Sequence, residues 1–147
     1  SPTRYTAVLT NHRHKTAMTV TIYHNPNCSK SRDALRFLTA SGIEPKIVLY
    51  LKEGWSHDQL ITLKIASSMD WTDMLRPDAG ALLKPFIIAD DDVAIINYLV
   101  EHPEALESPF VQTPKGVRLC RPLTRIIDII DQTPESPWLT EKGEQVL

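Results

Sequence analysis

The strongest constraint on the fold is a strand–helix–strand pattern that begins near residue 20. Val20 and Ile22 lie among β-forming residues and predict a short buried strand. Residues 29–41 then carry apolar side chains at helical spacing and precede Gly42, a residue type that commonly ends helices. Residues 46–51 predict a second strand, apolar enough to be buried on both faces. These elements together predict a βαβ unit with a right-handed crossover.

The middle of the chain, residues 56–103, has a helical pattern. Ser56 and Gln59 form a capping box, in which each side chain can bond the other residue's backbone N–H. A further helical turn is expected at residues 71–75, which the proline that follows should end. Residues 90–99 predict another helix, and its three leading aspartates suit helix capping better than metal binding.

The last part of the chain predicts a hairpin and a helix. Residues 110–112 and 117–120 are short strand patterns joined by a turn that contains Pro114 and Gly116. Apolar residues between 123 and 130 then recur at helical spacing. The order β-α-β, helices, β-β-α predicts an α/β, thioredoxin-like fold. In this fold a four-stranded mixed sheet is flanked by helices, and a helical insertion separates the βαβ and ββα halves.

The domain organisation follows from the 147-residue length, which suits one domain with its own core. Residues 1–18 are expected to be a leader or appended segment outside the fold, because residues 1–17 contain no acidic residue and only short apolar runs. Residues 19–133 are the predicted domain, and residues 134–147 are expected to be a loosely held tail.

Composition excludes several classes of function. The formal net charge of −2 gives no overall field that would attract nucleic acid, and there is no apolar run of membrane-spanning length. The only cysteines, Cys28 and Cys120, are too few for a disulfide scaffold and suggest a reducing, cytoplasmic location. The histidines and cysteines show no metal-binding spacing, so no metal is expected.

Cys28 lies between the first strand and the first helix, at the predicted helix start. Unpaired backbone N–H groups and the helix dipole at such a position favour the thiolate, which is the reactive form of cysteine. The same N–H groups can hold an oxyanion, so the first turn supplies the candidate anion-binding residues Ser29, Lys30, Ser31 and Arg32. The alternative for any lone cysteine is a small, buried, unreactive side chain.

Motifs spread over residues 19–130 resemble the arsenate reductase family that works with glutaredoxin. In chain order they are Tyr23-His24-Asn25-Pro26-x-Cys28-x-x-Ser31-Arg32, Glu44-Pro45 with Val48-Leu49-Tyr50-Leu51, Leu75-Arg76, His102-Pro103, and Thr113-Pro114-x-Gly116-x-Arg118-Leu119-Cys120-Arg121-Pro122. The first and last motifs are specific when they occur together, and either alone is weak.

The resemblance implies a role for individual residues. Cys28 matches the family's nucleophile, and His24 matches the residue that helps to hold it as thiolate. Arg76 and Arg121 match two arginines that bind the oxyanion and its arsenic adduct. The family has a third arginine before the proline of the third strand, and Ser108 occupies that position here. From the residues alone, two other roles are open. The His24 side chain can make a hydrogen bond within its loop, and the Arg76 charge can interact favourably with the dipole at a helix C-terminus.

The implied reaction is reduction of arsenate to arsenite, with glutathione as co-substrate, glutaredoxin as partner and no bound cofactor. Ser31 stands where a resolving cysteine of a Cys-x-x-Cys motif would lie, so the site should need an outside thiol. Two alternatives remain: a glutathione-dependent thiol-transfer enzyme of the same fold, marked by Ser108, and a non-enzymatic regulator resembling the Spx proteins. Ser31 disfavours the regulator, and the arginine pair Arg76 and Arg121 favours the reductase.

Overall fold

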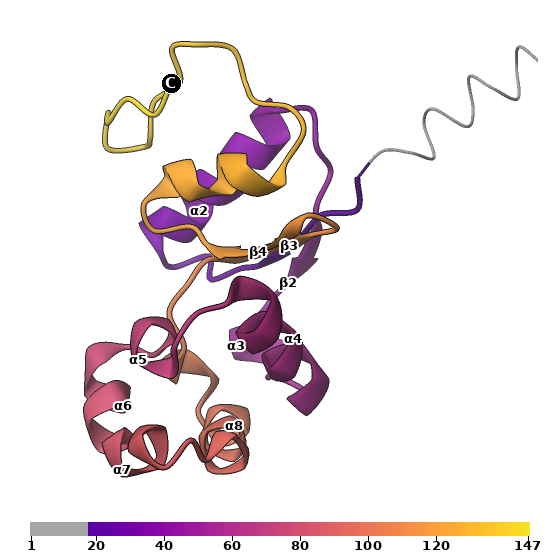
Figure 1. Ribbon diagram of the computed structural model, residues 1–147. Helices are drawn as coiled ribbons and strands as arrows, with labels where there is room; N and C mark the ends of the chain where they lie inside the picture. The colour runs from indigo at the N-terminus through magenta and orange to yellow at the C-terminus, as the bar shows by residue number, and fades with distance from the viewer. Residues whose placement is uncertain (1–17) are drawn as a thin grey trace, which may run out of the picture.

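A four-stranded mixed sheet forms the centre of the protein in the computed structural model, which describes residues 18–147. The strands are β1 (Thr21–Tyr23), β2 (Lys46–Val48), β3 (Phe110–Thr113) and β4 (Gly116–Leu119). Their order across the sheet is β2-β1-β3-β4, with β1 and β2 parallel and the other neighbours antiparallel. Figure 1 shows the sheet between two groups of helices, which confirms the predicted α/β architecture.

The crossover helix α2 (Ser29–Ala40) joins the two parallel strands, as the sequence predicts. Ala34, Phe37 and Leu38 are fully buried on its inner face, which explains the helical spacing of the apolar residues. The helix ends before Gly42, whose φ of +80° is the left-handed conformation that glycine adopts without steric cost.

The second strand is shorter and less buried than predicted. It is an edge strand, and Ile47 remains 46% exposed because β1 is its only neighbour. The residues after it form a short helix, α3 (Tyr50–Glu53), in place of more strand. The Glu53 side chain accepts a hydrogen bond from the Leu49 backbone N–H at 2.9 Å, which closes this helical turn and ends the strand.

The helical insertion contains more helices than the sequence predicts. They are α4 (His57–Ser67), α5 (Trp71–Met74), α6 (Pro77–Leu82), α7 (Lys84–Ile88), α8 (Asp92–Glu101) and the turn η1 (Pro103–Ala105). The capping box of Ser56 and Gln59 is present at the start of α4. The helices α6 and α7 are missing from the prediction, because a proline commonly ends a helix. Pro77 and Pro85 instead occupy first-turn positions, where the missing N–H costs nothing.

The final helical segment, η2 (Leu123–Ile129), is a 3₁₀-helix and not the α-helix that the spacing suggested. Ile126 and Ile129 are its fully buried residues, and they are three positions apart. Residues three apart lie on one line in a 3₁₀-helix, so this winding points both side chains into the core.

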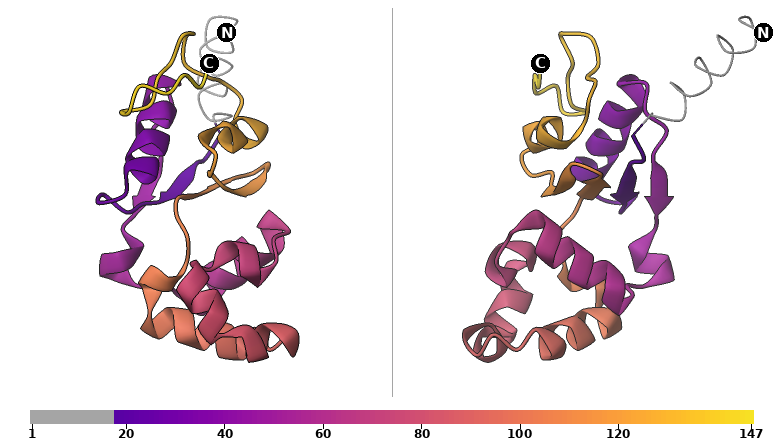
Figure 2. Two further views of the ribbon diagram at one scale, coloured as in Figure 1. Left: turned by 90° about the vertical axis from the view of Figure 1, so that its left-hand side faces the viewer. Right: turned by 45° about the vertical axis from the view of Figure 1, so that its right-hand side comes forward.

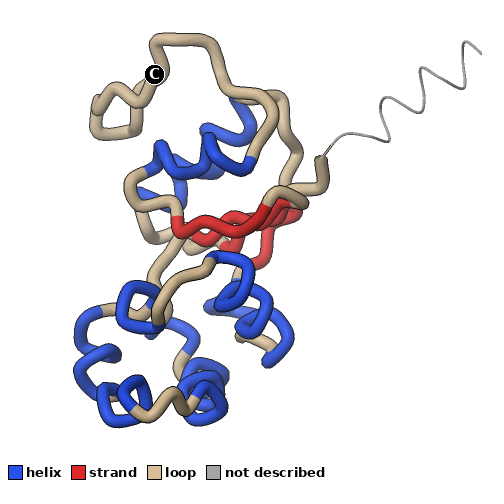
Figure 3. Tube along the Cα trace, viewed as in Figure 1, coloured by secondary structure: helices blue, strands red, loops and turns tan. Residues whose placement is uncertain are grey.

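The sheet separates two apolar cores because successive strand residues face opposite sides. Ile22 and Val111 pack with α2 and η2 on one face, whereas Tyr23 and Phe110 pack with the helices α3 to α8 on the other. Figure 2 shows the two layers from two further sides, and Figure 3 shows the strands between them. No helix of residues 18–147 is both long and apolar enough to cross a bilayer.

The C-terminal segment 134–147, which the sequence predicts to be a loosely held tail, packs along α2. The Trp138 ring meets the Phe37 ring edge-on, with centroids 5.1 Å apart, and the Arg36 guanidinium lies 4.9 Å from the Trp138 ring centre. The Glu141 backbone N–H donates to the Asp33 carboxylate at 2.8 Å. Residues 1–17 of the expected leader lie outside the described residues.

Candidate active site

Three of the predicted site residues, His24, Cys28 and Arg121, lie at one edge of the sheet. Tyr23, the last residue of β1, pairs with the last residue of β2 and with the first residue of β3. That β3 residue in turn pairs with Leu119, the last residue of β4. The segments just outside these strand ends therefore meet at a single edge. They are the loop 24–28, Leu49-Tyr50, Ser108-Pro109 and Cys120-Arg121.

Cys28 is the N-cap residue of α2, the helix start that the sequence predicts, and it is partly exposed. Its backbone is extended (φ −102°, ψ 121°), and its N–H donates to the Asn25 carbonyl at 3.0 Å, which closes the loop before the helix. The first helical hydrogen bond runs from Arg32 N–H to the Cys28 carbonyl at 3.0 Å. The three amides between these residues therefore point out of the helix start, where they can meet an anion.

His24 is buried and bonded to Ser31 across the cysteine loop. Its Nδ1 lies 2.6 Å from Ser31 Oγ, which also accepts the Asn25 N–H at 3.0 Å. Since that oxygen already accepts one proton, its own hydroxyl proton is free to go to Nδ1. Burial and the nearby Arg32 guanidinium lower the pKa of His24 and favour the neutral ring. The neutral His24 ring carries a single N–H, which lies on Nε2 when Nδ1 accepts the Ser31 hydroxyl proton.

The side chains of the four candidate residues in the first helical turn do not point to a common place. Ser31 faces His24, whereas Ser29 and Lys30 line a cavity between α2, Cys120 and the C-terminal segment. Arg32 turns toward that segment as well. These side chains therefore do not form one pocket, and the feature they share is the helix start itself.

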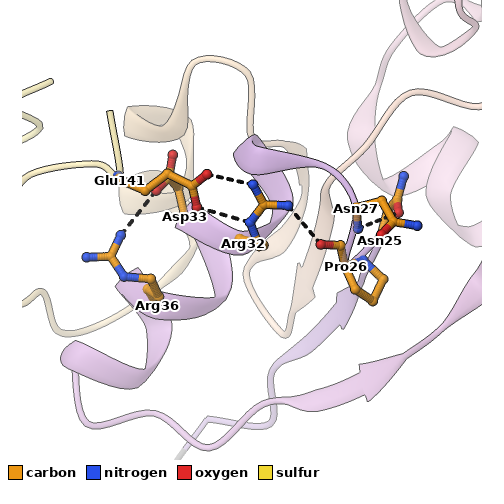
Figure 4. A network of polar contacts seen from close by, with 7 residues as sticks. All are labelled: Asn25, Pro26, Asn27, Arg32, Asp33, Arg36 and Glu141. Atoms are coloured by element: carbon orange, nitrogen blue, oxygen red, sulfur yellow. Dashed lines mark hydrogen bonds and ion pairs between the residues drawn. The ribbon is translucent and has the colours of Figure 1, made fainter. Parts of the chain in front are cut away.

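Arg32 is held by the C-terminal segment (Figure 4). Its Nε and Nη2 donate to the two carboxylate oxygens of Glu141 at 3.1 and 2.6 Å, and its Nη1 donates to the Pro26 carbonyl at 2.9 Å. The hydrogen bond from Arg32 lowers the pKa of Glu141. Arg32 remains close enough to Cys28 to interact with its charge, although its donors are committed elsewhere.

Arg76 and Arg121 approach segment 105–108 from different elements. Arg121 Nη1 donates to the Ser108 carbonyl at 3.1 Å, and its Nε lies 3.9 Å from a carboxylate oxygen of Glu107. Arg76 is the N-cap residue of α6, and its backbone N–H donates to the Ala105 carbonyl at 2.9 Å. The two arginines line separate hollows on the surface. The Ser108-Pro109 peptide bond is cis.

Tyr50, the first residue of α3, also lies at this edge of the sheet. The sequence did not indicate it as a site residue. It is 2% exposed, and its ring stacks on Trp55 with centroids 4.8 Å apart. Burial raises the pKa of the Tyr50 phenol. A hydrogen bond with the Ser108 side chain lowers this pKa, and the charges of Cys28, Arg76 and Glu107 also act on it. The available signal was its position at the end of a parallel strand, where functional residues gather.

Cys120 and Arg118 are the weaker candidates. Cys120 is buried in the core between the sheet and α2, and this burial raises the pKa of its thiol. A buried thiol of this kind is unreactive. Arg118, which belongs to the last sequence motif, lies 3.7 Å from the Asp128 carboxylate on η2. Among residues 18–147, no group of three histidine, cysteine or acidic side chains could hold a metal ion.

Comparison with known proteins adds to these observations. The ArsC family model matches residues 23–129. Arsenate reductase ArsI2 of Synechocystis sp. is 36% identical over 130 residues, which are 87% of this chain and 93% of that protein. An arsenate reductase of Rhizobium meliloti is 38% identical over 88% of this chain and 94% of its own length. The solved arsenate reductase from Vibrio cholerae has a TM-score of 0.68 and 34% identity, over 78% of this chain and 100% of that one. The chain belongs to the ArsC family.

Proposed function

We propose that this chain is an arsenate reductase that uses the Cys28 thiolate and takes its electrons from glutathione and glutaredoxin. The observation that carries the proposal is Cys28 itself, a partly exposed N-cap residue with outward-pointing amides beside it. The named relatives Synechocystis ArsI2 and the Rhizobium meliloti protein are arsenate reductases, which supports this substrate.

The first step is attack of the Cys28 thiolate on the arsenic atom of arsenate. A sulfur–arsenic bond forms, and one oxygen leaves as water or hydroxide. The amides at the start of α2, together with Arg76 and Arg121, offset the negative charge of the oxyanion. His24 supports the reaction by offering an N–H donor to the charged sulfur.

Glutathione supplies the second thiol. Its thiolate bonds to the Cys28 sulfur, and the electron pair of the sulfur–arsenic bond passes to arsenic, which is reduced from As(V) to As(III) and leaves as arsenite. Cys28 then carries glutathione in a mixed disulfide, which a glutaredoxin thiol removes by exchange. An outside thiol fits the site because Ser31 replaces a resolving cysteine and Cys120 is buried.

The test is arsenate-dependent NADPH oxidation in the presence of glutathione, glutathione reductase and glutaredoxin. The wild-type chain should support turnover, Cys28→Ser should abolish it, and Cys120→Ser should largely retain it. Omission of glutathione or of glutaredoxin should each stop multiple turnover. Loss of activity in Cys120→Ser, with activity kept in Cys28→Ser, would overturn the assignment of the nucleophile.

A second candidate is thiol transfer on glutathione mixed disulfides, and Ser108 is the observation that favours it. With serine in place of the family's arginine, the site carries one guanidinium fewer for a doubly charged anion. The same coupled assay with a glutathionylated peptide in place of arsenate separates the two functions. The two free cysteines of the described residues fit a reducing cytoplasm in either case.

A further inference from the structure

We propose that the Tyr50 hydroxyl is a further oxyanion-binding group, which acts as a neutral hydrogen-bond donor. This inference rests on the proposed function, since it names a residue that contacts the same substrate. It concerns the edge of the sheet that also holds Cys28 and Ser108.

The position of Tyr50 follows from the sheet topology. The parallel strands β1 and β2 end side by side, because Tyr23 pairs with Val48, and the His24 N–H donates to the Val48 carbonyl at 2.8 Å. The chain then continues from β1 into the loop of Cys28 and from β2 into Tyr50. The thiol and the phenol therefore leave neighbouring strands at the same edge.

The ring of Tyr50 is held firmly in place. It is buried and lies nearly parallel to the Trp55 ring, with an angle of 20° between the planes. A donor fixed in this way needs little reorganisation when a negative charge forms beside it, which is the property of an effective oxyanion-binding group.

The third strand brings Ser108 to the same edge. Ser108 is buried, and its carbonyl is already bonded to Arg121 Nη1 at 3.1 Å. Its short side chain interacts with the Tyr50 hydroxyl. Ser108 thus adds no charge to the site, and the phenol is a polar group that interacts with it there.

Burial and the nearby charges keep the phenol of Tyr50 protonated. Burial raises the pKa of Tyr50, and the negative charges of Cys28 and Glu107 act in the same direction. The hydrogen bond with Ser108 and the Arg76 guanidinium lower this pKa, but each is a smaller influence than burial. At neutral pH the group therefore acts as an O–H donor and not as a phenolate that would repel arsenate. A neutral donor orients an oxyanion and attracts it less strongly at a distance than a guanidinium does.

The experiment compares Tyr50→Phe with Tyr23→Phe. Both rings pack against Trp55, and both substitutions remove only a hydroxyl, but the Tyr23 hydroxyl donates to Gln112 on β3 at 2.7 Å. Two readouts are used: kcat/KM for arsenate in the coupled assay, and the arsenate concentration that half-protects Cys28 from iodoacetamide. Thermal melting of each variant confirms that it folds.

Tyr50→Phe should lower kcat/KM for arsenate by about 10- to 100-fold, since one hydrogen bond to developing charge is lost. It should also raise the half-protecting arsenate concentration severalfold, and Tyr23→Phe should change neither quantity. If the wild-type chain does not reduce arsenate, the proposed function is wrong. The protection assay would then still test whether the Tyr50 hydroxyl contributes to arsenate binding. Equal protection of the wild type and Tyr50→Phe, or no protection of either, would overturn this inference.

Discussion

The Nδ1 atom of His24 and the Oγ atom of Ser31 are 2.6 Å apart, so a hydrogen bond spans the loop that carries Cys28. Ser31 also receives the Asn25 N–H at 3.0 Å, and one hydroxyl therefore fixes both the imidazole and the loop backbone. The serine that replaces a resolving cysteine is thus a structural part of the nucleophile's surroundings.

Ser31→Ala should destabilise the fold and slow the reaction of Cys28. It leaves a buried imidazole nitrogen and the Asn25 N–H without this partner, which costs about 1–3 kcal/mol of unfolding free energy. Urea denaturation measures the loss, and the rate of iodoacetamide labelling reports on Cys28. Thr39→Ala, which removes an exposed hydroxyl from the same helix, is the control. Unchanged stability and labelling in Ser31→Ala would contradict this role.

His24 should make stability depend on pH. Burial and Arg32 lower the pKa of His24 in the folded chain, whereas the unfolded value is about 6.5. Between these two values the unfolded chain binds more protons, so the free energy of unfolding falls as the pH decreases below about 6.5. Urea unfolding should show this slope in the wild type and a weaker slope in His24→Gln. The exposed His57 serves as control, and His57→Gln should keep the wild-type slope; parallel curves for all three chains would refute the assignment.

The two cysteines should differ in reactivity. Iodoacetamide should modify Cys28 in the native chain and leave Cys120 unmodified, because Cys28 is partly exposed at a helix start and Cys120 is buried. Mass spectrometry of peptides after brief labelling measures the modified fraction of each. In urea both should react, which provides the control. Native labelling of Cys120 at the rate of Cys28 would show that the core around it opens.

Features set by a few neighbouring residues were predictable from the sequence. The helix start at Cys28 and the capping box of Ser56 depend on local backbone groups, and the structure has both. The hairpin of β3 and β4 also follows from local turn residues. In these cases the physics of one or two helical turns, or of one tight turn, determines the outcome.

Features set by distant residues were not predictable in this way. Arg32 was expected to help to bind an oxyanion, but its donors go to Glu141, which is 109 positions away in the sequence. Tyr50 was part of a predicted strand, and its importance depends on where Ser108 and Cys28 lie in three dimensions. Periodicity describes which face of an element is apolar, and it carries no information about such long-range partners.

The contact between Trp138 and α2 should contribute to stability. Trp138→Ala should lower the free energy of unfolding by about 1–3 kcal/mol, less than for a fully buried tryptophan, because Trp138 is only half-buried against Phe37. Leu139→Ala changes the adjacent, exposed residue and should have little effect. Urea denaturation measures both variants. Trp138→Ala should also speed proteolysis within residues 134–147, and equal stability of the two variants would support a loosely held tail.

Glu107 should weaken oxyanion binding, since its carboxylate lies 3.9 Å from Arg121 Nε and competes with an anion for the guanidinium. Glu107→Gln should lower the KM for arsenate about threefold to tenfold, which corresponds to roughly 1 kcal/mol for a partly exposed charge pair. Asp128→Asn is the matched control, because it removes the carboxylate 3.7 Å from Arg118 and changes the net charge equally. The coupled assay at varied arsenate concentration measures both variants. An increased KM in Glu107→Gln alone would show that Glu107 orients Arg121 for binding and does not compete with the substrate.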